Sequence, residues 1–320
     1  MKFLSVPENK LMLVILVGIL LASSAVALYL HIFLKKGKAK EIGDLLGRRV
    51  RTWWTMTIVL MLATLCGNAG SVIVFGLTSF FLLREFITIT PTRRGDHHAL
   101  FWVFLVIPLQ YYLLWLGWYG LFIILIPVYA FLIIPVRMAV SGETKGFLER
   151  AAKIQWGLIL CVYCISHAPG LLKLEISNDP TAGLRLLVYL GIIAQTIDVS
   201  HKIFDKMAGR HRFAPQLNDE LCLEGFLLGM TTAGIIGALL YRMTPFAPWQ
   251  SFQLSLFIAI VGYAGCLCLY AIKKDRGGKG VVIVETSEPM IDRVISLCFA
   301  APVFFHFIRF FCMDKPIIMF

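Results

Sequence analysis

The chain has 320 residues, of which 58% are apolar and only 15% are charged, and its mean hydropathy is +0.79. An average soluble domain carries about 25% charged residues, so this composition excludes a water-soluble enzyme, a disordered chain and a disulfide scaffold. The formal net charge of +11 fits basic cytoplasmic loops of a membrane protein better than a nucleic-acid surface. We therefore expect no nucleic-acid partner.

Separate apolar segments follow one another along the chain, and a membrane-spanning helix needs about 20 such residues. We predict an all-α, polytopic integral membrane protein with about ten transmembrane helices. The clearest spans are Leu11–Leu34, Leu100–Trp118, Leu121–Val136, Ile154–Leu172, Leu184–Phe204, Phe226–Arg242, Ser251–Ile272 and Val294–Phe311. The first is interpreted as a retained span and not a signal peptide, because it lacks a small-residue cleavage site with a mature domain beyond it.

The segment Trp53–Leu83 is long for one span and short for two, and Gly67-Asn68-Ala69-Gly70 interrupts it. Two crossings would place five basic loops on the same side of the membrane. These loops are 35–52, 84–98, 137–153, 202–224 and 273–293, and they hold 23 of the 30 Lys and Arg residues. Because basic loops face the cytoplasm, the asymmetry favours two crossings, with both termini on the external side.

The domain organisation follows from these spans. We expect an N-terminal transmembrane helix with a basic cytoplasmic loop over residues 1–52, and one membrane domain over residues 53–320. No soluble domain interrupts the pattern. Any chemistry must therefore occur in the bilayer or at its cytoplasmic surface.

Several polar residues stand where a bilayer disfavours them. A charge inside a span is costly and usually functional. Asp198 lies about one turn from a predicted helix end, so it either snorkels toward water or faces an enclosed polar cavity that binds metal or phosphate. Residues 201–212 and 273–280 are basic and contain glycine, which suits phosphate or anionic headgroups. Asp292 and Arg293 place an acid and a base at the start of the last span.

Two metal-like patterns have simpler interpretations. Cys161 and Cys164 form a C-x-x-C pair, but no second pair follows, and both fall in an unbroken apolar helix. They are interpreted as reduced cysteines that pack as small hydrophobic residues. Asp96, His97 and His98 lack metal-ligand spacing and are interpreted as an interfacial loop.

Four segments carry a resemblance to a known family. They are residues 79–98, Ile154-Gln155-Trp156-Gly157, Ser166-His167-Ala168-Pro169 and Cys298-Phe299-Ala300-Ala301-Pro302-Val303-Phe304-Phe305. Together they resemble the phosphatidate cytidylyltransferase (CDP-diacylglycerol synthase) family over about residue 50 to the C-terminal region. The resemblance implies Mg²⁺-assisted reaction of CTP with phosphatidate to give CDP-diacylglycerol and pyrophosphate. It also implies a bacterial inner membrane.

The signature motifs of that family are only partly present. Its C-terminal motif has the form S-x-x-K-R-D-x-G-x-K-D, then G-H-G-G, then D-R-x-D-S. This chain retains Lys273, Lys274 in the arginine position, Asp275, Gly277, Lys279, Asp292, Arg293 and Ser296. Tyr270, Gly280, Thr286-Ser287-Glu288-Pro289 and Ile295 replace other signature residues.

An upstream family motif, S-P-x-K-T-x-E-G, has also changed. Only Glu224 and Gly225 remain, and Leu221 and Cys222 replace the lysine and the threonine. Arg210 still matches the G-R ahead of this motif, and Asp198 matches an aspartate further upstream.

The resemblance implies a set of site residues. The catalytic residues, if the chain is active, would be Asp292, Arg293 and Lys273. The substrate-binding residues would be Asp198, Arg210, Glu224, Lys274 and Lys279. The ligands of Mg²⁺ would be Asp292 and Asp198, with Glu288 as a further candidate.

The lost residues are those that would touch nucleotide and metal. Losing one donor aimed at a transition state costs roughly 10²–10³ in rate. The leading hypothesis is therefore a catalytically degenerate relative that keeps a headgroup pocket for an anionic phospholipid such as phosphatidate, and for which CTP binding is in question. The alternative is an active CTP-dependent enzyme in which Glu220, Glu285 or Glu288 rebuilds the metal site.

A transporter is disfavoured because the chain lacks internal symmetry. Either family hypothesis is compatible with a homodimer or a lipid-enzyme partner.

Overall fold

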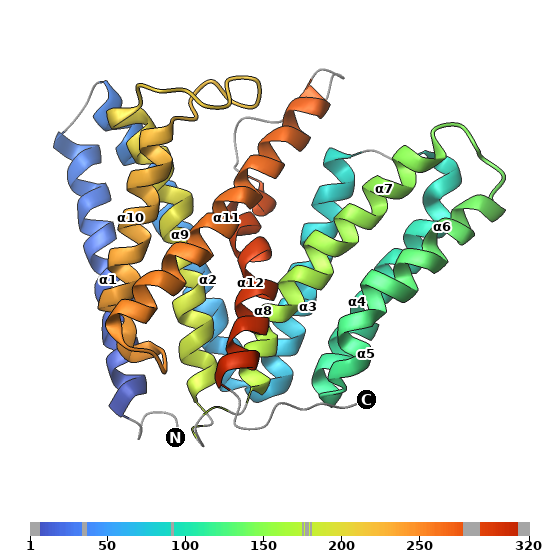
Figure 1. Cartoon of the computed structure of the whole chain (residues 1–320), viewed down its shortest axis with the longest axis horizontal. Coiled ribbons are helices and arrows are strands. Elements are labelled where there is room, and N and C mark those ends of the chain that lie inside the picture. The colour runs from blue at the N-terminus through green and yellow to red at the C-terminus, as the bar shows by residue number, and fades with distance from the viewer. Residues whose placement is uncertain are drawn as a thin grey trace.

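A computed structural model of the chain describes residues 7–33, 37–90, 93–174, 176, 179, 181–277 and 289–312. It is built from helices, as predicted (Figure 1). Eight helical segments in these ranges are long and apolar enough to cross a membrane. Their elements are α1 (Pro7–Phe33), α3 (Gly67–Ile89), α4 (His97–Leu116), α5 with α6 (Tyr119–Ile124 and Phe131–Val140), α7 with α8 (Phe147–Leu158 and Ile165–Gly170), α9 (Ala182–Ala208), α11 (Pro248–Gly277) and α12 (Met290–Cys312). Two more helices, α2 (Lys38–Leu65) and α10 (Leu223–Leu239), run beside them (Figure 1).

The ambiguous segment 53–83 forms parts of two helices. α2 ends at Leu65 and α3 begins at Gly67, whose φ of 72° lies in the left-handed region that glycine adopts without a Cβ penalty. The two helices pack against each other after this reversal. Residues 53–83 therefore belong to two helices, of which α3 is a candidate membrane span. The crossing of α2 stays a prediction.

One expectation about this region is wrong. Residues 38–52 were expected to be part of a basic loop, but they form the first turns of α2. Their leucines, arginines, lysines and alanine favour a helix, and no proline interrupts them. The apolar segment of α2 is therefore extended by a charged amphipathic segment. The domain boundary expected at residue 52, which falls inside α2, stays a prediction.

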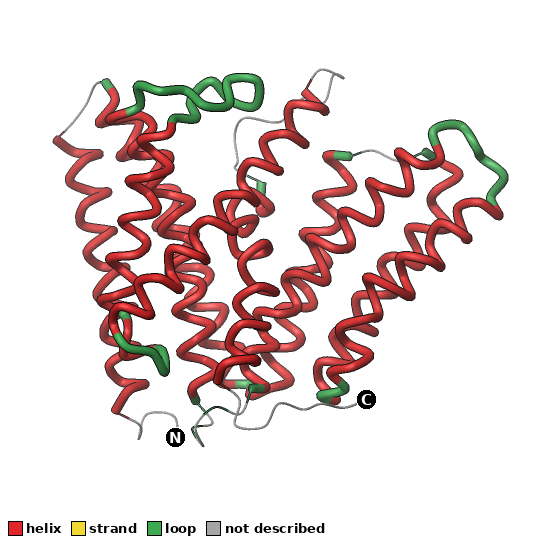
Figure 2. The backbone as a smooth tube through the Cα atoms, viewed as in Figure 1, coloured by secondary structure: helices red, strands yellow, loops and turns green. Residues whose placement is uncertain are grey.

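The connections divide between the two ends of the bundle (Figure 2). One end carries residues 37–52, 84–90, 141–146, 209–222 and 273–277, and we call it the basic end. The reversals at 66–67, 117–118 and 240–247 lie at the opposite end, with the first residues of α1 and the last of α12 (Figures 1 and 2). This arrangement agrees with the distribution of basic residues predicted from the sequence.

Helix α9 is the central element of one half of the bundle. It packs against α2, α10, α11 and α12, and 72% of its most apolar stretch is buried. Glycines on α10 allow a close approach, since a Cβ on Gly229 would lie 3.1 Å from the backbone nitrogen of His201. Gly225 faces Asp205 in the same way. The glycine of the E-G pair thus has a packing role.

The two metal-like sequence patterns have structural explanations. Cys161 and Cys164 are free, buried cysteines in one continuous helical span, within a π-helical segment between α7 and α8. Asp96 accepts a hydrogen bond from the backbone nitrogen of Arg93 (3.1 Å) and pairs with Nε of Arg150 (3.1 Å). Asp96 therefore ties together two connections at the basic end.

Candidate functional site

Four helices bring polar side chains together near the basic end. α2, α9, α11 and α12 supply them. We call this group the polar centre. It consists of Arg49 from α2, Asp198 and Lys202 from α9, Cys266 and Lys273 from α11, and Asp292 and Ser296 from α12.

Asp198 is the most connected member of the polar centre. Its Oδ2 lies 2.9 Å from Nη1 of Arg49, and these two side chains are 2% and 1% exposed. Its Oδ1 lies 3.1 Å from Nζ of Lys202, which is on the next turn of α9. A buried carboxylate is tolerated only when charge partners and hydrogen bonds compensate for its lost hydration. Asp198 is therefore fixed by two cations instead of snorkelling alone toward water.

The other members link α11 and α12 to this pair. The thiol of Cys266 lies 3.5 Å from Oδ1 of Asp198 and 3.2 Å from Oγ of Ser296. Nζ of Lys273 lies 2.5 Å from Oδ2 of Asp292. Arg49 also approaches the backbone oxygen of Asp292 at 3.4 Å. One arginine thus bridges α9 and the first turn of α12.

The cations of the polar centre are candidates for binding an anionic ligand. Its members provide three cations, Arg49, Lys202 and Lys273, and two carboxylates, Asp198 and Asp292. A third carboxylate, Glu85, borders the group and accepts a hydrogen bond from the backbone nitrogen of Met290 (3.0 Å). Lys202 and Lys273 retain 21% and 22% exposure, so they can turn toward a ligand. Lysine and arginine side chains bind phosphate oxygens by charge-assisted hydrogen bonds.

An apolar groove of about 350 Å³ adjoins the polar centre. α1, α2, α3, α9 and α12 supply most of its lining, with Leu20, Leu60, Val74, Leu187 and Val294 as representative residues. Gln195, one turn before Asp198 on α9, also lines it. Gln195 accepts a hydrogen bond from Nε1 of Trp53 (2.9 Å) and donates one to the backbone oxygen of Arg293 (2.7 Å). The groove therefore begins where the charged residues end.

Three of the predicted site residues meet in the polar centre. Asp198, Asp292 and Lys273 come together there, as the family resemblance implies. Arg293 is adjacent and partly buried, and Lys274 is exposed. Lys279 and Glu288 lie outside the described residues.

Arg210 and Glu224 form a separate arrangement. The carboxylate of Glu224 accepts hydrogen bonds from the backbone nitrogens of Arg210 (3.2 Å) and His211 (3.1 Å), and it pairs with Nδ1 of His211 (2.5 Å). In this structure Glu224, at the start of α10, therefore joins the two ends of the loop between α9 and α10 and closes it. Partial burial and the nearby carboxylates of Asp205 and Glu224 raise the pKa of the neighbouring Cys222 thiol.

The hydrogen bonds of Glu224 predict a local effect of its removal. Bonds to a charged group contribute about 1.5–3 kcal/mol each, so Glu224→Ala should speed hydrogen exchange at the amides of Arg210 and His211 by roughly tenfold or more. Mass spectrometry of exchanged peptides measures this rate. Glu220→Ala, an exposed change in the same loop, is the matched control and should leave the rate unchanged. Equal rates in the two variants would contradict the closing role of Glu224.

Sequence reasoning missed Arg49 and Cys266 as members of the polar centre, and it placed the neighbouring His201 only in the basic segment 201–212. A signal for Arg49 was present, because it interrupts the helical apolar stripe of Ile42, Leu45, Leu46 and Trp53. His201 stands three residues after Asp198 and therefore on the same helix face. Nothing in the sequence distinguishes Cys266 from the other cysteines in apolar runs.

Two of the positions that depart from the family motifs are enclosed. Ile295, in place of an aspartate, is 2% exposed and belongs to the apolar core. Leu221, in place of a lysine, is 1% exposed and packs in the core around α9 and α10. Apolar packing therefore occupies two positions where the motifs have charged residues.

Comparisons with known proteins place the chain among related sequences. A family profile described as "Cytidylyltransferase family" matches residues 47–311. "Uncharacterized protein YnbB" of Escherichia coli K12 is 33% identical over 269 residues, which cover 82% of this chain and 87% of that protein. The "Phosphatidate cytidylyltransferase" proteins of Chlamydia trachomatis and Chlamydia muridarum are 23% and 24% identical over 134 residues, or 40% of this chain and 44% of each relative. No solved structure matches the chain.

Proposed function

Because the chain belongs to the cytidylyltransferase family, we propose that this integral membrane protein binds an anionic phospholipid of the phosphatidate class and has lost most of the cytidylyl-transfer activity. The lipid phosphate contacts Arg49, Lys202 and Lys273, and an acyl chain lies in the adjoining groove. The observation that carries the proposal is the junction of a cationic polar centre with an apolar groove. Such a junction matches the two chemically distinct parts of one phospholipid.

The orientation of the bundle follows from the same proposal. Phosphatidate places its phosphate at the membrane surface, and the polar centre lies near the basic end. With the basic end in the cytoplasm, the site opens toward the inner leaflet. The similarity to an Escherichia coli protein supports a bacterial inner membrane.

The donors of the polar centre do not fit a resident Mg²⁺ ion, which the resemblance implies for the family's reaction. Mg²⁺ prefers an octahedron of oxygen ligands and is usually held by carboxylates, water and substrate phosphates. Here Arg49 and Lys202 engage Asp198, and Lys273 engages Asp292. In addition, the side chain beside Oδ1 of Asp198 is the thiol of Cys266, and sulfur is not a ligand that Mg²⁺ prefers. This arrangement supports a weakened nucleotide site.

The second candidate is an active cytidylyltransferase. It is favoured by Asp292, Arg293 and Lys273, which match the family signature and lie at the groove or in the polar centre. An active enzyme would require a further carboxylate beside Asp292, such as Glu288, to complete a metal site. The two candidates differ in CTP binding and turnover, which one assay measures.

The test uses the full-length protein purified in detergent. Fluorescent phosphatidate is titrated against it, with unlabelled phosphatidate and phosphatidylcholine as competitors. We expect saturable binding that phosphatidate displaces and phosphatidylcholine does not. CTP, with or without Mg²⁺, should give no saturable signal and no CDP-diacylglycerol. Absence of saturable phosphatidate binding would refute the headgroup site, and steady formation of CDP-diacylglycerol would establish the active alternative.

A further inference from the structure

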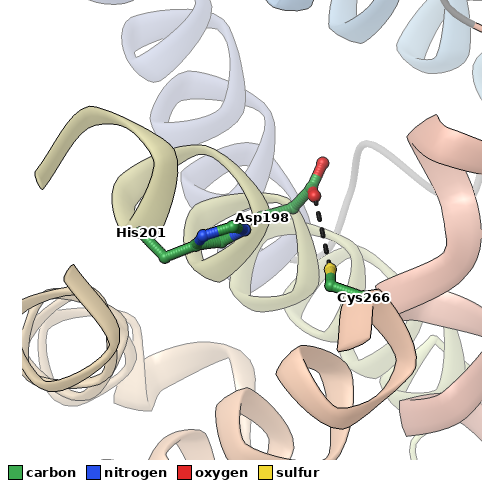
Figure 3. A group of neighbouring side chains, drawn as sticks. All are labelled: Asp198, His201 and Cys266. Carbon is green, nitrogen blue, oxygen red and sulfur yellow. Dashed lines mark hydrogen bonds between the residues drawn. The ribbon is translucent and has the colours of Figure 1, made fainter. Parts of the chain in front are cut away.

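Three buried side chains with three different ligand atoms converge beside the polar centre. They are the Asp198 carboxylate, the His201 imidazole and the Cys266 thiol (Figure 3). One ligand atom from each lies within 4.8 Å of the others. α9 supplies two of these residues at a spacing of three, and α11 supplies the cysteine. Cys266 also packs in an apolar core, whereas Asp198 and His201 are polar residues buried in the bundle.

The orientation of His201 leaves one ring nitrogen available. Nδ1 lies 3.3 Å from Oδ2 of Asp205, and Oδ1 of Asp205 accepts a hydrogen bond from the backbone nitrogen of Cys222 (3.0 Å). An ionised carboxylate only accepts, so Nδ1 carries the proton and Nε2 presents a lone pair. This is the arrangement by which carboxylates orient metal-binding histidines.

Nε2 of His201 is itself unusual. It is fully buried and has no hydrogen-bond partner within the described part of the chain. The residue is 0% exposed, so bulk water does not donate a hydrogen bond to this nitrogen. Burying a polar atom without a hydrogen-bond partner costs free energy, and a ligand bound to that atom would offset this cost. The hydroxyl of Tyr263, whose ring lies edge-on to His201 at 5.0 Å, is another such atom in the same place, although further buried polar atoms without a hydrogen-bond partner occur elsewhere in the described part of the chain.

The contacts of Asp198 show how a cation would enter. Arg49 occupies Oδ2, whereas Lys202 and Cys266 lie at Oδ1. Lys202 is partly exposed, so its ammonium group can withdraw toward water. A metal ion would then take the place of that ammonium group at Oδ1. Arg49 would remain on Oδ2 as the hydrogen-bond partner that a ligating carboxylate normally has.

We propose that Asp198, His201 and Cys266 form a binding site for a divalent transition metal ion of the zinc class. One oxygen, one nitrogen and one sulfur ligand suit Zn²⁺ and its neighbours, whereas Mg²⁺ takes oxygen ligands. On binding, the Cys266 thiol releases its proton to solvent and coordinates as the thiolate. Three protein ligands leave a fourth tetrahedral position, as in zinc sites that bind water or substrate.

Cobalt provides the test, because a thiolate bound to Co²⁺ gives a charge-transfer absorption band in the near ultraviolet. The full-length protein in detergent is stripped with a chelator and titrated with CoCl₂. We expect the band to saturate at one equivalent, to disappear on addition of Zn²⁺ and to persist in excess Mg²⁺. Cys266→Ser should abolish it. Cys268→Ser, a change two residues away on the same helix, should leave it intact.

Two further variants separate ligation from damage to the fold. His201→Gln should weaken Co²⁺ binding by roughly tenfold or more. Lys202→Met removes the competing ammonium group and should strengthen Co²⁺ binding, which a misfolded protein would not do. Absence of the band in the unaltered protein, or an equal band in Cys266→Ser, would overturn the proposal. Unchanged affinity in Lys202→Met would overturn the proposed exchange of lysine for metal.

Discussion

The Gly191→Phe variant is expected to lose phosphatidate binding while remaining folded. Gly191 lines the apolar groove, and a Cβ added there meets no atom within 4 Å among the residues that the structure describes. The new side chain would occupy space that we assign to an acyl chain. Displacing about four methylene groups from the groove, at about 0.8 kcal/mol each, weakens binding by roughly a hundredfold. Titration with fluorescent phosphatidate measures the change.

Gly18→Phe is the matched control for this variant. Gly18 also lies in a long helix, is exposed, and has open space at its Cβ position, but it does not line the groove. Replacing a helical glycine favours the helix in both variants, so neither should unfold more readily. Equal binding by Gly191→Phe and the unaltered protein would remove the groove from the proposed lipid site.

The Arg49→Met variant is expected to lose both stability and lipid binding. Arg49 and Asp198 form an almost fully buried ion pair, and removing one partner of such a pair typically costs about 3–5 kcal/mol. The variant also removes one of the three cations that we assign to the lipid phosphate. Thermal unfolding in detergent and phosphatidate titration measure the two effects separately. Arg51→Met, an exposed change two residues along α2, should alter neither.

A double variant separates the two roles of Arg49. Arg49→Met combined with Asp198→Leu removes both buried charges, and apolar replacement of a buried pair is often neutral or stabilising. We therefore expect the double variant to regain most of the lost stability but not the binding of phosphatidate. Recovery of binding together with stability would show that Arg49 serves the fold and not the ligand.

The membrane architecture was largely predictable because lipid imposes simple requirements on sequence. Helical spans need long apolar segments, and basic residues mark one side. The ambiguous segment 53–83 does divide into two helices, and Gly67 at the reversal has the positive φ expected of a glycine turn. That both helices cross the membrane stays a prediction. The start of α2 was mispredicted because charged residues at positions 38–52 were taken to indicate a loop, although charge does not prevent a helix.

The candidate site was predictable only in part. Asp198, Lys273 and Asp292 stood out because they are charged residues in or beside apolar segments and match motif positions. Whether Arg210 and Glu224 touch substrate stays a prediction. Their motif positions say nothing of the hydrogen bonds that hold Glu224 against the loop after α9.

The sequence by itself determined that this protein is a multi-span helical membrane protein of one enzyme family, since hydropathy, charge asymmetry and motifs are properties of local sequence. Only the tertiary structure decided which charged residues meet. Arg49 and Asp198 are far apart in the chain, and Cys266 resembles any other cysteine in an apolar helix. They come together because α2 and α11 both pack against α9, and packing between helices that are distant in the sequence fixes such contacts.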